Sequence, residues 1–411
     1  MKNTLIAICC FLTLFTACKE SNFQKELEKD DLFSLNYGNY ENEIYLFDLK
    51  NAHEINTVHC MKDGIFYILN SEAGKMQKFN SYGDLLSIIY NEDLNPTPEF
   101  AKNTNGQIKS ALEEQTGDAT KIAVTYPFND IGSIAVDNNK NIYIVDYLPN
   151  NRFENDASSE NILRQIVLRF APDGSFIHYL TQDGVEGIPF PTIQSIHTNE
   201  NNELIVICFT QQHYIAYWFS EEGQLINRYA IDKSMISHEN VDLTAIDYIS
   251  LEQILPDYNE PVLYLKFDYY DSTIDESTMI SSGIKFVKSV VYPLNVTTNT
   301  FEESISIPAY EKSIKQPYGT KIFLHPYTLL GSAENGTLFF YITTDNGLAL
   351  LVTNRDSKKI SEQEISIPLS NSLYESFSVS NNGIISALMA HEENLNVSWW
   401  RTDSLLQELA N

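Results

Sequence analysis

Carboxylates and tyrosines stand closest together in the run Asp268-Tyr269-Tyr270-Asp271, which two more acidic residues soon follow. Carboxylate oxygens are the hard ligands that Ca²⁺ prefers, and tyrosine rings stack on sugars. The run is therefore a candidate binding site for a cation or a carbohydrate. The same residues would also suit a solvated acidic loop at the start of an insertion, so the sequence leaves both interpretations open.

The other residue types that carry chemistry form no recognised motif. The sequence contains no GxSxG or HExxH motif, no glycine-rich phosphate loop and no EF-hand spacing. Its eight histidines are scattered singly, and none has the spacing of a paired metal ligand. We therefore expect no catalytic residue and no metal site from these motifs, and we interpret each histidine as a satisfied core or surface residue.

The elements that would position these residues are short apolar strands that recur along the chain. Each one follows a cluster of Asp, Asn, Gly or Glu that is typical of a turn. Strands this uniformly apolar are expected where sheets are covered on both faces. The repeated strand occurs at 64–69, 141–146, 203–208, 261–266, 336–341 and 383–388.

A second repeated unit is an aromatic residue followed four positions later by glycine and then by large apolar residues. It starts at Phe79, Phe170 and Phe219, and a degenerate copy starts at Trp400. A glycine at a fixed offset is typical of a hairpin turn that needs a positive φ. The aromatic ring would anchor the strand that enters the hairpin.

These repeats predict an all-β fold, a β-propeller of six blades with four strands each, over residues 43–408. The intervals between the repeated strands exceed what a compact blade needs, so we place insertions near 91–127, 149–161 and 271–283. The last repeat has about three strands before the chain ends, and 43–48 offers a fourth. We expect this N-terminal strand to close the ring, because closure removes an open sheet edge.

The second repeat is the fullest copy, with Ile142–Asp146, Gln165–Gly174 and Gly187–Pro191, and it resembles the NHL-type propeller repeat. Asn70 takes the place of Asp146 in the first repeat, and the later repeats depart from the pattern. The resemblance implies a propeller that in most cases serves as a binding scaffold and in a minority of cases is an enzyme. Within this resemblance Asp146 is a candidate binding residue.

The first eighteen residues have the pattern of an export signal. Lys2 precedes an uncharged apolar stretch at 4–17, which is too short to span a bilayer. The stretch ends at Cys18, with Phe15 where a leucine is usual, and resembles the lipobox of bacterial lipoproteins in its looser spirochaete or Bacteroidota form. The resemblance implies a signal peptide at 1–17, lipidation of Cys18 and a tether at 18–42. An ordinary secretory signal with a coincidental cysteine is the alternative.

A lipid on Cys18 would attach the protein to a cell membrane, for which we favour the outer membrane; the side it faces stays open. Together with the lipobox, the segment Phe79–Leu86 and the Asn-Pro segment at 95–98 resemble a spirochaete lipoprotein family of unassigned function. The two cysteines that remain in the body, Cys60 and Cys208, are expected to be buried free thiols, although a disulfide between them stays open.

The chain has 55 acidic and 27 basic residues and a formal net charge of −28. Such a field repels nucleic acids, which need Lys and Arg to neutralise their phosphates. We therefore exclude nucleic acid as a partner.

Three functional hypotheses remain. We favour a lipid-anchored scaffold that binds or assembles envelope proteins through a propeller face, since it needs no catalytic residue. The second is an envelope hydrolase or lactonase in which Asp146 and acidic residues of other blades hold Ca²⁺ in a central channel. The third is a surface protein that binds carbohydrate or a host ligand through exposed aromatic rings. The sequence identifies no cofactor, and Ca²⁺ is the one that these hypotheses consider.

Overall fold

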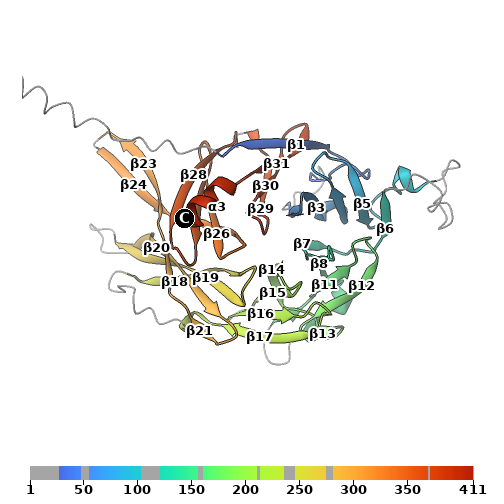
Figure 1. Ribbon diagram of the computed structural model, residues 1–411, viewed down its shortest axis with the longest axis horizontal. Coiled ribbons are helices and arrows are strands. Elements are labelled where there is room, and N and C mark those ends of the chain that lie inside the picture. The colour runs from blue at the N-terminus through green and yellow to red at the C-terminus, as the bar shows by residue number, and fades with distance from the viewer. Residues whose placement is uncertain are drawn as a thin grey trace, which may run out of the picture.

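The computed structural model describes residues 27–47, 55–102, 121–155, 161–210, 213–235, 246–274, 281–317, 319–368 and 371–410. Within these residues six mainly antiparallel sheets stand around a central axis and form a six-bladed β-propeller (Figure 1). The predicted fold class is therefore confirmed. Cys18 and the predicted signal peptide lie outside the described residues, as does the middle of each predicted insertion. No helix among the described residues has the length and apolar character that crossing a bilayer requires.

The blades follow one another in chain order, and each is described from its inner strand outward. Blade 1 contains β2 (Val58–Lys62), β3 (Ile65–Asn70), β4 (Lys75–Phe79), β5 (Leu85–Tyr90) and the parallel strand β6 (Ile122–Thr125). Blade 2 contains β7 (Ile131–Val136), β8 (Ile142–Tyr147), β11 (Gln165–Phe170), β12 (Phe176–Thr181) and β13 (Gly184–Val185). Blade 3 contains β14 (Thr192–Thr198), β15 (Leu204–Phe209), β16 (Tyr214–Phe219) and β17 (Leu225–Ile231).

The second half of the ring is built in the same way. Blade 4 contains β18 (Tyr248–Pro256), β19 (Val262–Ile274), β20 (Ser281–Asn295), β21 (Thr300–Phe301) and β22 (Ile305–Ile307). Blade 5 contains β25 (Thr328–Ala333), β26 (Thr337–Thr344), β27 (Gly347–Asn354) and β28 (Ile360–Ser366). Blade 6 contains β29 (Tyr374–Val379), β30 (Ile385–Ala390), β31 (Asn394–Trp400) and β1 (Lys29–Asn36).

Several shorter elements lie outside these six sheets. Two hairpins are added to the ring, and a C-terminal helix follows β31. They are β9 (Glu154–Asn155) with β10 (Ile162–Leu163), β23 (Tyr310–Gln316) with β24 (Gly319–His325), and α3 (Asp403–Ala410). The 3-10 turns are η1 (Ser71–Ala73), η2 (Glu99–Ala101), η3 (Asn150–Arg152) and η4 (Lys233–Met235).

The six predicted apolar strands are all present, and each forms the second strand of its blade. In β15 every residue from Leu204 to Cys208 is buried, because the neighbouring blades cover both faces of the sheet. The outer strand of the same blade, β17, is largely exposed along its middle. Burial on both faces explains why the second strands are the clearest signal in the sequence.

The predicted aromatic-glycine unit forms the turn between the third and fourth strands of blades 1, 2 and 3. Its aromatic residue is fully buried at Phe79, Phe170 and Phe219. The glycine that follows has a φ near +85° in each turn, which an L side chain rarely adopts. The degenerate copy at Trp400 does not form such a hairpin, and α3 follows instead. No outer strand is needed there, because the outer strand of blade 6 comes from the N-terminus.

The ring is closed by an N-terminal strand, as predicted, but the strand is β1 and not 43–48. β1 pairs antiparallel with β31 from Lys29 opposite Trp400 to Asn36 opposite Asn394. The expected tether at 18–42 therefore contains a strand of the propeller. The apolar residues of 43–48 suggested a strand because they are buried. Ile44, however, forms an isolated β-bridge with Tyr37 and is not part of the ladder of blade 6. The exposed charged residues of β1 are compatible with its position as the outer strand, because one face of an outer strand is in contact with solvent.

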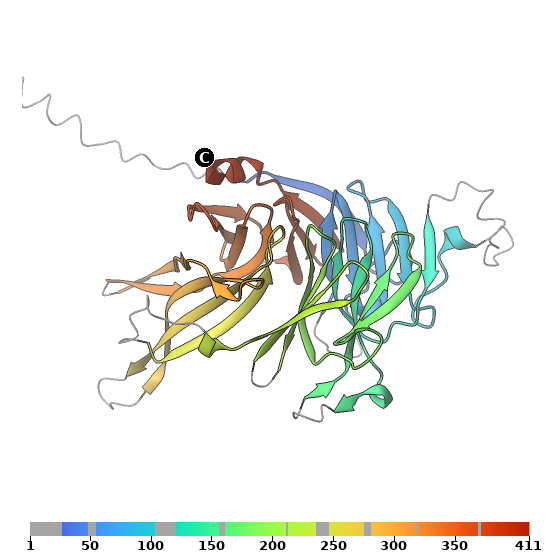
Figure 2. The same ribbon diagram turned by 60° about the horizontal axis from the view of Figure 1, so that its bottom comes forward.

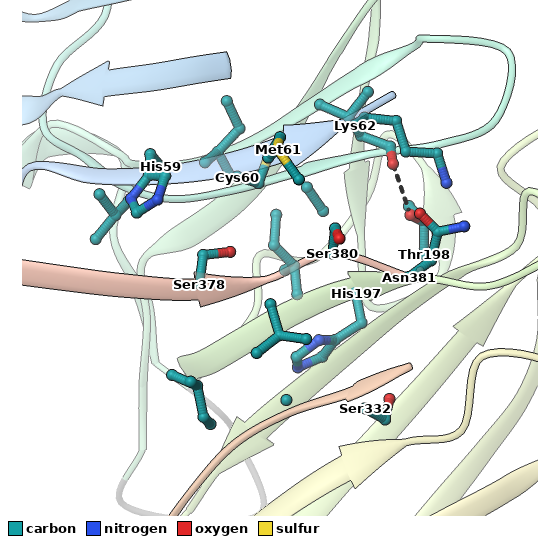
Figure 3. Close-up of a pocket in the computed structure, with 18 of the residues that line it drawn as sticks. His59, Cys60, Met61, Lys62, His197, Thr198, Ser332, Ser378, Ser380 and Asn381 are labelled. Atoms are coloured by element: carbon teal, nitrogen blue, oxygen red, sulfur yellow. Dashed lines mark hydrogen bonds between the residues drawn. The ribbon is translucent and has the colours of Figure 1, made fainter. Parts of the chain in front are cut away.

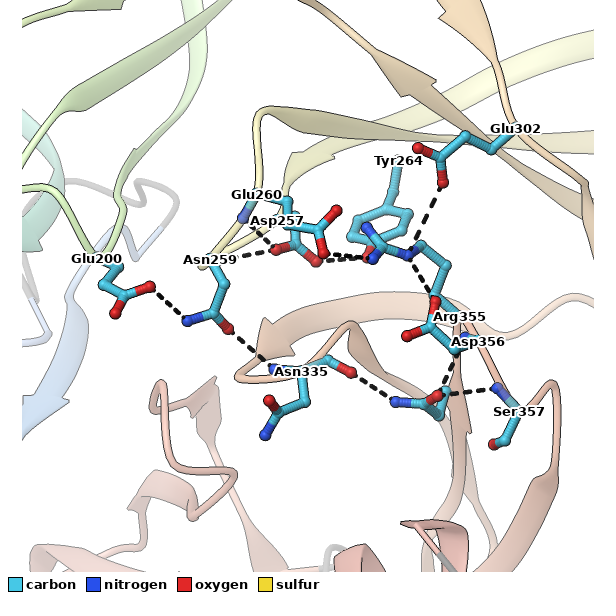
Figure 4. A network of polar contacts seen from close by, with 11 residues as sticks. Glu200, Asp257, Asn259, Glu260, Tyr264, Glu302, Asn335, Arg355, Asp356 and Ser357 are labelled. Carbon is cyan, nitrogen blue, oxygen red and sulfur yellow. Dashed lines mark hydrogen bonds and ion pairs between the residues drawn. The ribbon is translucent and has the colours of Figure 1, made fainter.

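The two faces of the propeller differ. On one face, here called the turn face, short turns join the inner and second strands of every blade. Polar side chains link the turns of blades 3, 4 and 5 there (Figure 4). Asn259 of blade 4 donates to Glu200 of blade 3 over 2.7 Å and accepts the backbone N–H of Asn335 of blade 5 over 2.9 Å. These bonds fix the order and spacing of neighbouring inner strands.

The opposite face, here called the insertion face, carries the connections from which the predicted insertions leave. The β9–β10 hairpin and the far ends of β19 and β20 project there, away from α3 on the turn face (Figure 2). Leu27, the first described residue, shares a buried cluster with Leu405 and Leu409 of α3. The chain therefore enters the propeller at the turn face.

Candidate functional site

The inner strands of all six blades surround a central channel with a cavity of about 280 Å³ (Figure 3). Because every blade contributes, residues far apart in the sequence face one another across it. Its polar lining is His59 and Lys62 of β2, His197 and Thr198 of β14, Tyr258, Ser332 of β25, and Ser376, Ser378, Ser380 and Asn381 in and after β29. This channel is the candidate site, because all six blades contribute to it.

Lys62 carries the only charge among the described residues that line this cavity. Its side chain lies at the turn-face end of β2 and the residue is only 5% exposed. The ammonium Nζ donates to the hydroxyl of Tyr258 over 3.4 Å and lies 5.2 Å from the centre of the same ring. Burial lowers the pKa of Lys62, and the nearby carboxylates of Asp63 and Asp137 oppose this change.

Those two carboxylates form ion pairs or hydrogen bonds elsewhere. Asp63 forms an ion pair with Lys140. Asp137 is fully buried and accepts hydrogen bonds from the backbone and side chain of Asn141, both at 2.8 Å. Lys62 therefore forms no ion pair with a carboxylate in the part of the chain that the structure describes.

Two histidines face the same channel from different blades. His59 Nε2 lies 3.0 Å from the hydroxyl of Ser386, and His197 Nε2 lies 2.9 Å from that of Ser195. Burial lowers the pKa of each imidazole to about 4. Both rings are thus neutral near pH 7 and offer hydrogen bonds instead of charge.

The lining does not form an activated nucleophile. Neither His59 nor His197 is hydrogen-bonded to a described carboxylate that could orient it as a base. Cys60 is half-buried, and burial raises the pKa of its thiol to about 12, so it is not a thiolate at neutral pH. Cys208 is buried, and both cysteines are free thiols. Among the described residues, the lining thus presents neutral hydroxyl, imidazole and amide groups and a single ammonium.

Asp146 is buried, but it is not among the residues that line the cavity. Its Oδ1 accepts the backbone N–H of Asp130 over 2.8 Å and that of Asn129 over 3.2 Å. Asn70 makes the same type of contact in blade 1, where its Oδ1 accepts the N–H of Tyr45 over 2.8 Å. Both side chains therefore hold the segment that leads into the inner strand of their own blade. Burial, partly opposed by these hydrogen bonds, raises the pKa of Asp146 to about 6.

The run Asp268-Tyr269-Tyr270-Asp271 lies on β19, where successive side chains point to opposite faces. Asp268 is buried in an ion pair with Lys266 at 2.7 Å, and the Ser289 hydroxyl donates to it over 2.6 Å. Tyr269 is buried on the other face. Tyr270 and Asp271 are half-buried, so the structure does not bring the four side chains to one site. No group of three or more His, Cys, Asp or Glu able to hold a metal occurs among the described residues.

The sequence interpretation missed His59, Lys62 and His197 as neighbours. They lie on inner strands, which are less uniformly apolar than the second strands and were not used to define the repeat. One signal was available. His59 pairs with Ile68 and His197 pairs with Ile205, both on the apolar second strands. Each inner strand could therefore have been located in the sequence as the segment just before a second strand.

No protein-family model matches the chain, and no curated protein sequence matches it. Among solved structures, the polysaccharide lyase Uly1 is 7% identical, with 92% of this chain and 100% of that chain covered and a TM-score of 0.40. The β-propeller domain of the Trilobed protease from Pyrococcus furiosus is 8% identical, with 84% and 94% covered and a TM-score of 0.38. A gluconolactonase from Xanthomonas campestris is 10% identical, with 82% of each chain covered and a TM-score of 0.39.

At these identities the likeness concerns the fold alone, and the assignment to the six-bladed β-propellers rests on the strand topology described above. Activities of the similar structures are not transferred to this chain.

Proposed function

We propose that this protein is a lipid-anchored binding scaffold of the bacterial cell envelope, attached through Cys18, that engages a protein partner with its insertion face. The finer family assignments, to NHL-type repeats and to a spirochaete lipoprotein family, belong to the same proposal. The observation that carries it is the position of Leu27, which shares a buried cluster with Leu405 and Leu409 of α3. Helix α3 lies on the turn face, opposite the insertions (Figure 2).

The length of the lead-in supports this orientation. Leu27 is nine residues after Cys18, and an extended chain covers at most about 3.5 Å per residue. A lipid on Cys18 would therefore keep Leu27 within about 30 Å of the membrane surface. The turn face would lie toward the membrane, and the insertion face would point away from it toward a partner.

The channel lining gives less support to a Ca²⁺-dependent hydrolase or lactonase. Ca²⁺ takes six to eight oxygen ligands, usually with several carboxylates among them. The described lining offers hydroxyls, imidazoles, one amide and one ammonium, and Asp146 is engaged elsewhere. A hydrolytic mechanism would also need a base, and no described carboxylate is hydrogen-bonded to either channel histidine.

One observation favours carbohydrate binding as a second candidate. Phe209 at the end of β15 is 45% exposed, and Tyr248 at the start of β18 is 54% exposed. Both lie at the insertion-face ends of neighbouring blades, with the half-buried rings of Tyr214 and Tyr270 beside them in the ladders. Exposed rings at adjacent strand ends could stack on sugars. Glycan-array binding that is lost in a Phe209→Ala/Tyr248→Ala variant would favour this candidate.

Site-directed photo-crosslinking in living cells tests the scaffold proposal. A photoreactive amino acid is placed at Tyr248 on the insertion face or at Tyr82 on the turn face, where Tyr82 is 85% exposed. We expect a defined protein adduct from position 248 and none from position 82. Cys18→Ala, the matched control, should release the protein from membranes and lose the adduct. Adducts from position 82 alone, or an unlipidated Cys18 in the mature protein, would contradict the proposal.

A further inference from the structure

We propose that the turn-face end of the central channel binds a small organic carboxylate that carries hydroxyl groups, with the carboxylate paired to Lys62. The inference concerns the channel and does not depend on the scaffold proposal, on Cys18 or on the insertion face. Three independent features of the lining point to it, and Figure 3 shows their arrangement.

The first feature is a buried ammonium group that forms no ion pair with a described carboxylate, although Asp63 and Asp137 lie nearby. Lys62 is 5% exposed, and its nearest described partner is the neutral hydroxyl of Tyr258. That hydroxyl already donates to Asn138 over 2.9 Å, so the phenol is held in place with its oxygen toward the ammonium. A buried ammonium is unfavourable unless it is paired, and a bound anion would supply the missing partner. One isolated ammonium matches a single negative charge better than a doubly charged phosphate, which usually meets several donors.

The second feature is that the lining excludes acidic residues. Asp and Glu make up 55 of the 411 residues of the chain, so a random set of 23 would contain about three. The 23 residues that line the cavity contain none. The described lining therefore carries no carboxylate that would repel a bound one. The two carboxylates near Lys62 are engaged elsewhere, Asp63 with Lys140 and Asp137 with Asn141.

The third feature is the set of neutral polar groups that line the same channel as the ammonium. The channel that Lys62 lines also contains Ser332 of blade 5, and Ser378 and Asn381 of blade 6, whose inner strand lies beside β2 (Figure 3). The Ser378 hydroxyl makes no hydrogen bond to another described residue, whereas Ser332 donates to the carbonyl of Pro256 over 2.9 Å. His197 of blade 3 adds a neutral imidazole to the same lining. Such donors and acceptors match the hydroxyl groups of a ligand and would give no advantage to an apolar acid.

The test compares two sugars that differ in charge. D-galacturonate and D-galactose are titrated by calorimetry and by saturation-transfer NMR into the mature chain with Cys18→Ala, which keeps the whole body in soluble form. We expect galacturonate to bind and to raise the melting temperature, and galactose to bind at least tenfold more weakly. Equal binding of the two sugars, no binding of galacturonate, or preferential binding of inorganic phosphate would overturn the proposal.

Two lysine variants assign the site. Lys62→Gln should weaken galacturonate binding at least tenfold. Lys78→Gln is the matched control, since Lys78 also lies over a tyrosine ring in blade 1, 5.5 Å from the centre of Tyr67, but does not line the cavity. The control should bind as the parent chain does. Unchanged binding in Lys62→Gln, or equal loss in both variants, would place the ligand elsewhere. If Lys62→Gln does not fold, the parent protein can be acetylated at Lys62 instead. We then expect acetylation to abolish galacturonate binding, and bound galacturonate to protect Lys62 from acetylation.

Discussion

The backbone of Lys29 pairs with that of Trp400, so the first and the last described strands are neighbours in blade 6. The pairing continues over β1 and leaves β31 without an open edge. Two side-chain bonds reinforce it: Trp399 Nε1 donates to Asp30 over 2.8 Å, and the Ser398 hydroxyl donates to Asp31 over 2.8 Å. The ring is therefore held closed by residues from both ends of the chain.

Removal of β1 should destabilise the whole propeller. A mature chain that begins at residue 38 exposes the edge of β31, and we expect its melting temperature to fall by more than 10 °C, with increased aggregation. A chain that begins at Leu27 retains β1 and should melt like the full mature chain. Differential scanning calorimetry of both truncations is the measurement. Equal melting of the two would show that β1 is dispensable for closure.

Asp146→Asn should change the pH dependence of stability. Since the pKa of folded Asp146 is about 6, above its ordinary value of 3.8, the folded state takes up a proton first as the pH falls. Its contribution to stability therefore grows as the pH falls from about 6 toward 4, by about 3 kcal/mol at most at about 1.4 kcal/mol per pKa unit. The variant lacks this gain, and its amide oxygen can still accept the N–H of Asp130.

Urea unfolding of the parent chain and of Asp146→Asn at pH 8, 6 and 4.5 checks this prediction. We expect the variant to be at least as stable at pH 8 and relatively less stable at pH 4.5. A variant that loses more than about 2 kcal/mol at pH 8 would instead indicate that the ionised carboxylate is required.

The channel histidines should make the protein sensitive to acid. The pKa of each imidazole is about 4 in the folded state, against an ordinary value of 6.5, so the unfolded chain binds these protons first. The stability they contribute is complete above about pH 6.5 and is lost as the pH falls toward 4, by about 1–3 kcal/mol for each ring.

A His59→Gln/His197→Gln variant tests this effect. Between pH 7 and 5 its melting temperature should fall less than that of the parent chain, while His391→Gln, outside the channel, should leave the slope unchanged. An identical slope in the double variant and the parent would mean that the two imidazoles do not carry the acid sensitivity.

Removal of one partner of the buried Lys266–Asp268 pair should lower the free energy of unfolding strongly, whereas replacement of both by apolar residues should lower it little. Its side chains are 2% and 3% exposed and lie 2.7 Å apart. Lys266→Met leaves the Asp268 carboxylate buried without its cation and should cost about 3–5 kcal/mol. Replacement of both by Lys266→Met/Asp268→Leu should restore most of that loss, because the surrounding blade is apolar. A double-mutant cycle by urea unfolding measures the coupling, and additive losses would show that the two residues do not interact.

The architecture was accessible from sequence because it depends on local patterns. A second strand that is covered on both faces must be apolar along its length, as β15 is. Six such strands therefore indicate six blades. The hairpins at Gly83, Gly174 and Gly223 need a left-handed residue, so their glycines recur at a fixed distance from a buried ring. Both requirements are met within one blade, and the sequence of that blade shows them.

The site was decided by the tertiary structure, because a channel residue has its neighbours in other blades. His59, Lys62 and His197 meet only once six blades have closed into a ring. Conversely, Asp268 and Tyr269 are adjacent in sequence but point to opposite faces of β19. The choice of β1 over 43–48 as the closing strand was likewise a matter of tertiary packing: an outer strand meets solvent on one face, so its sequence may be polar and carries little signal.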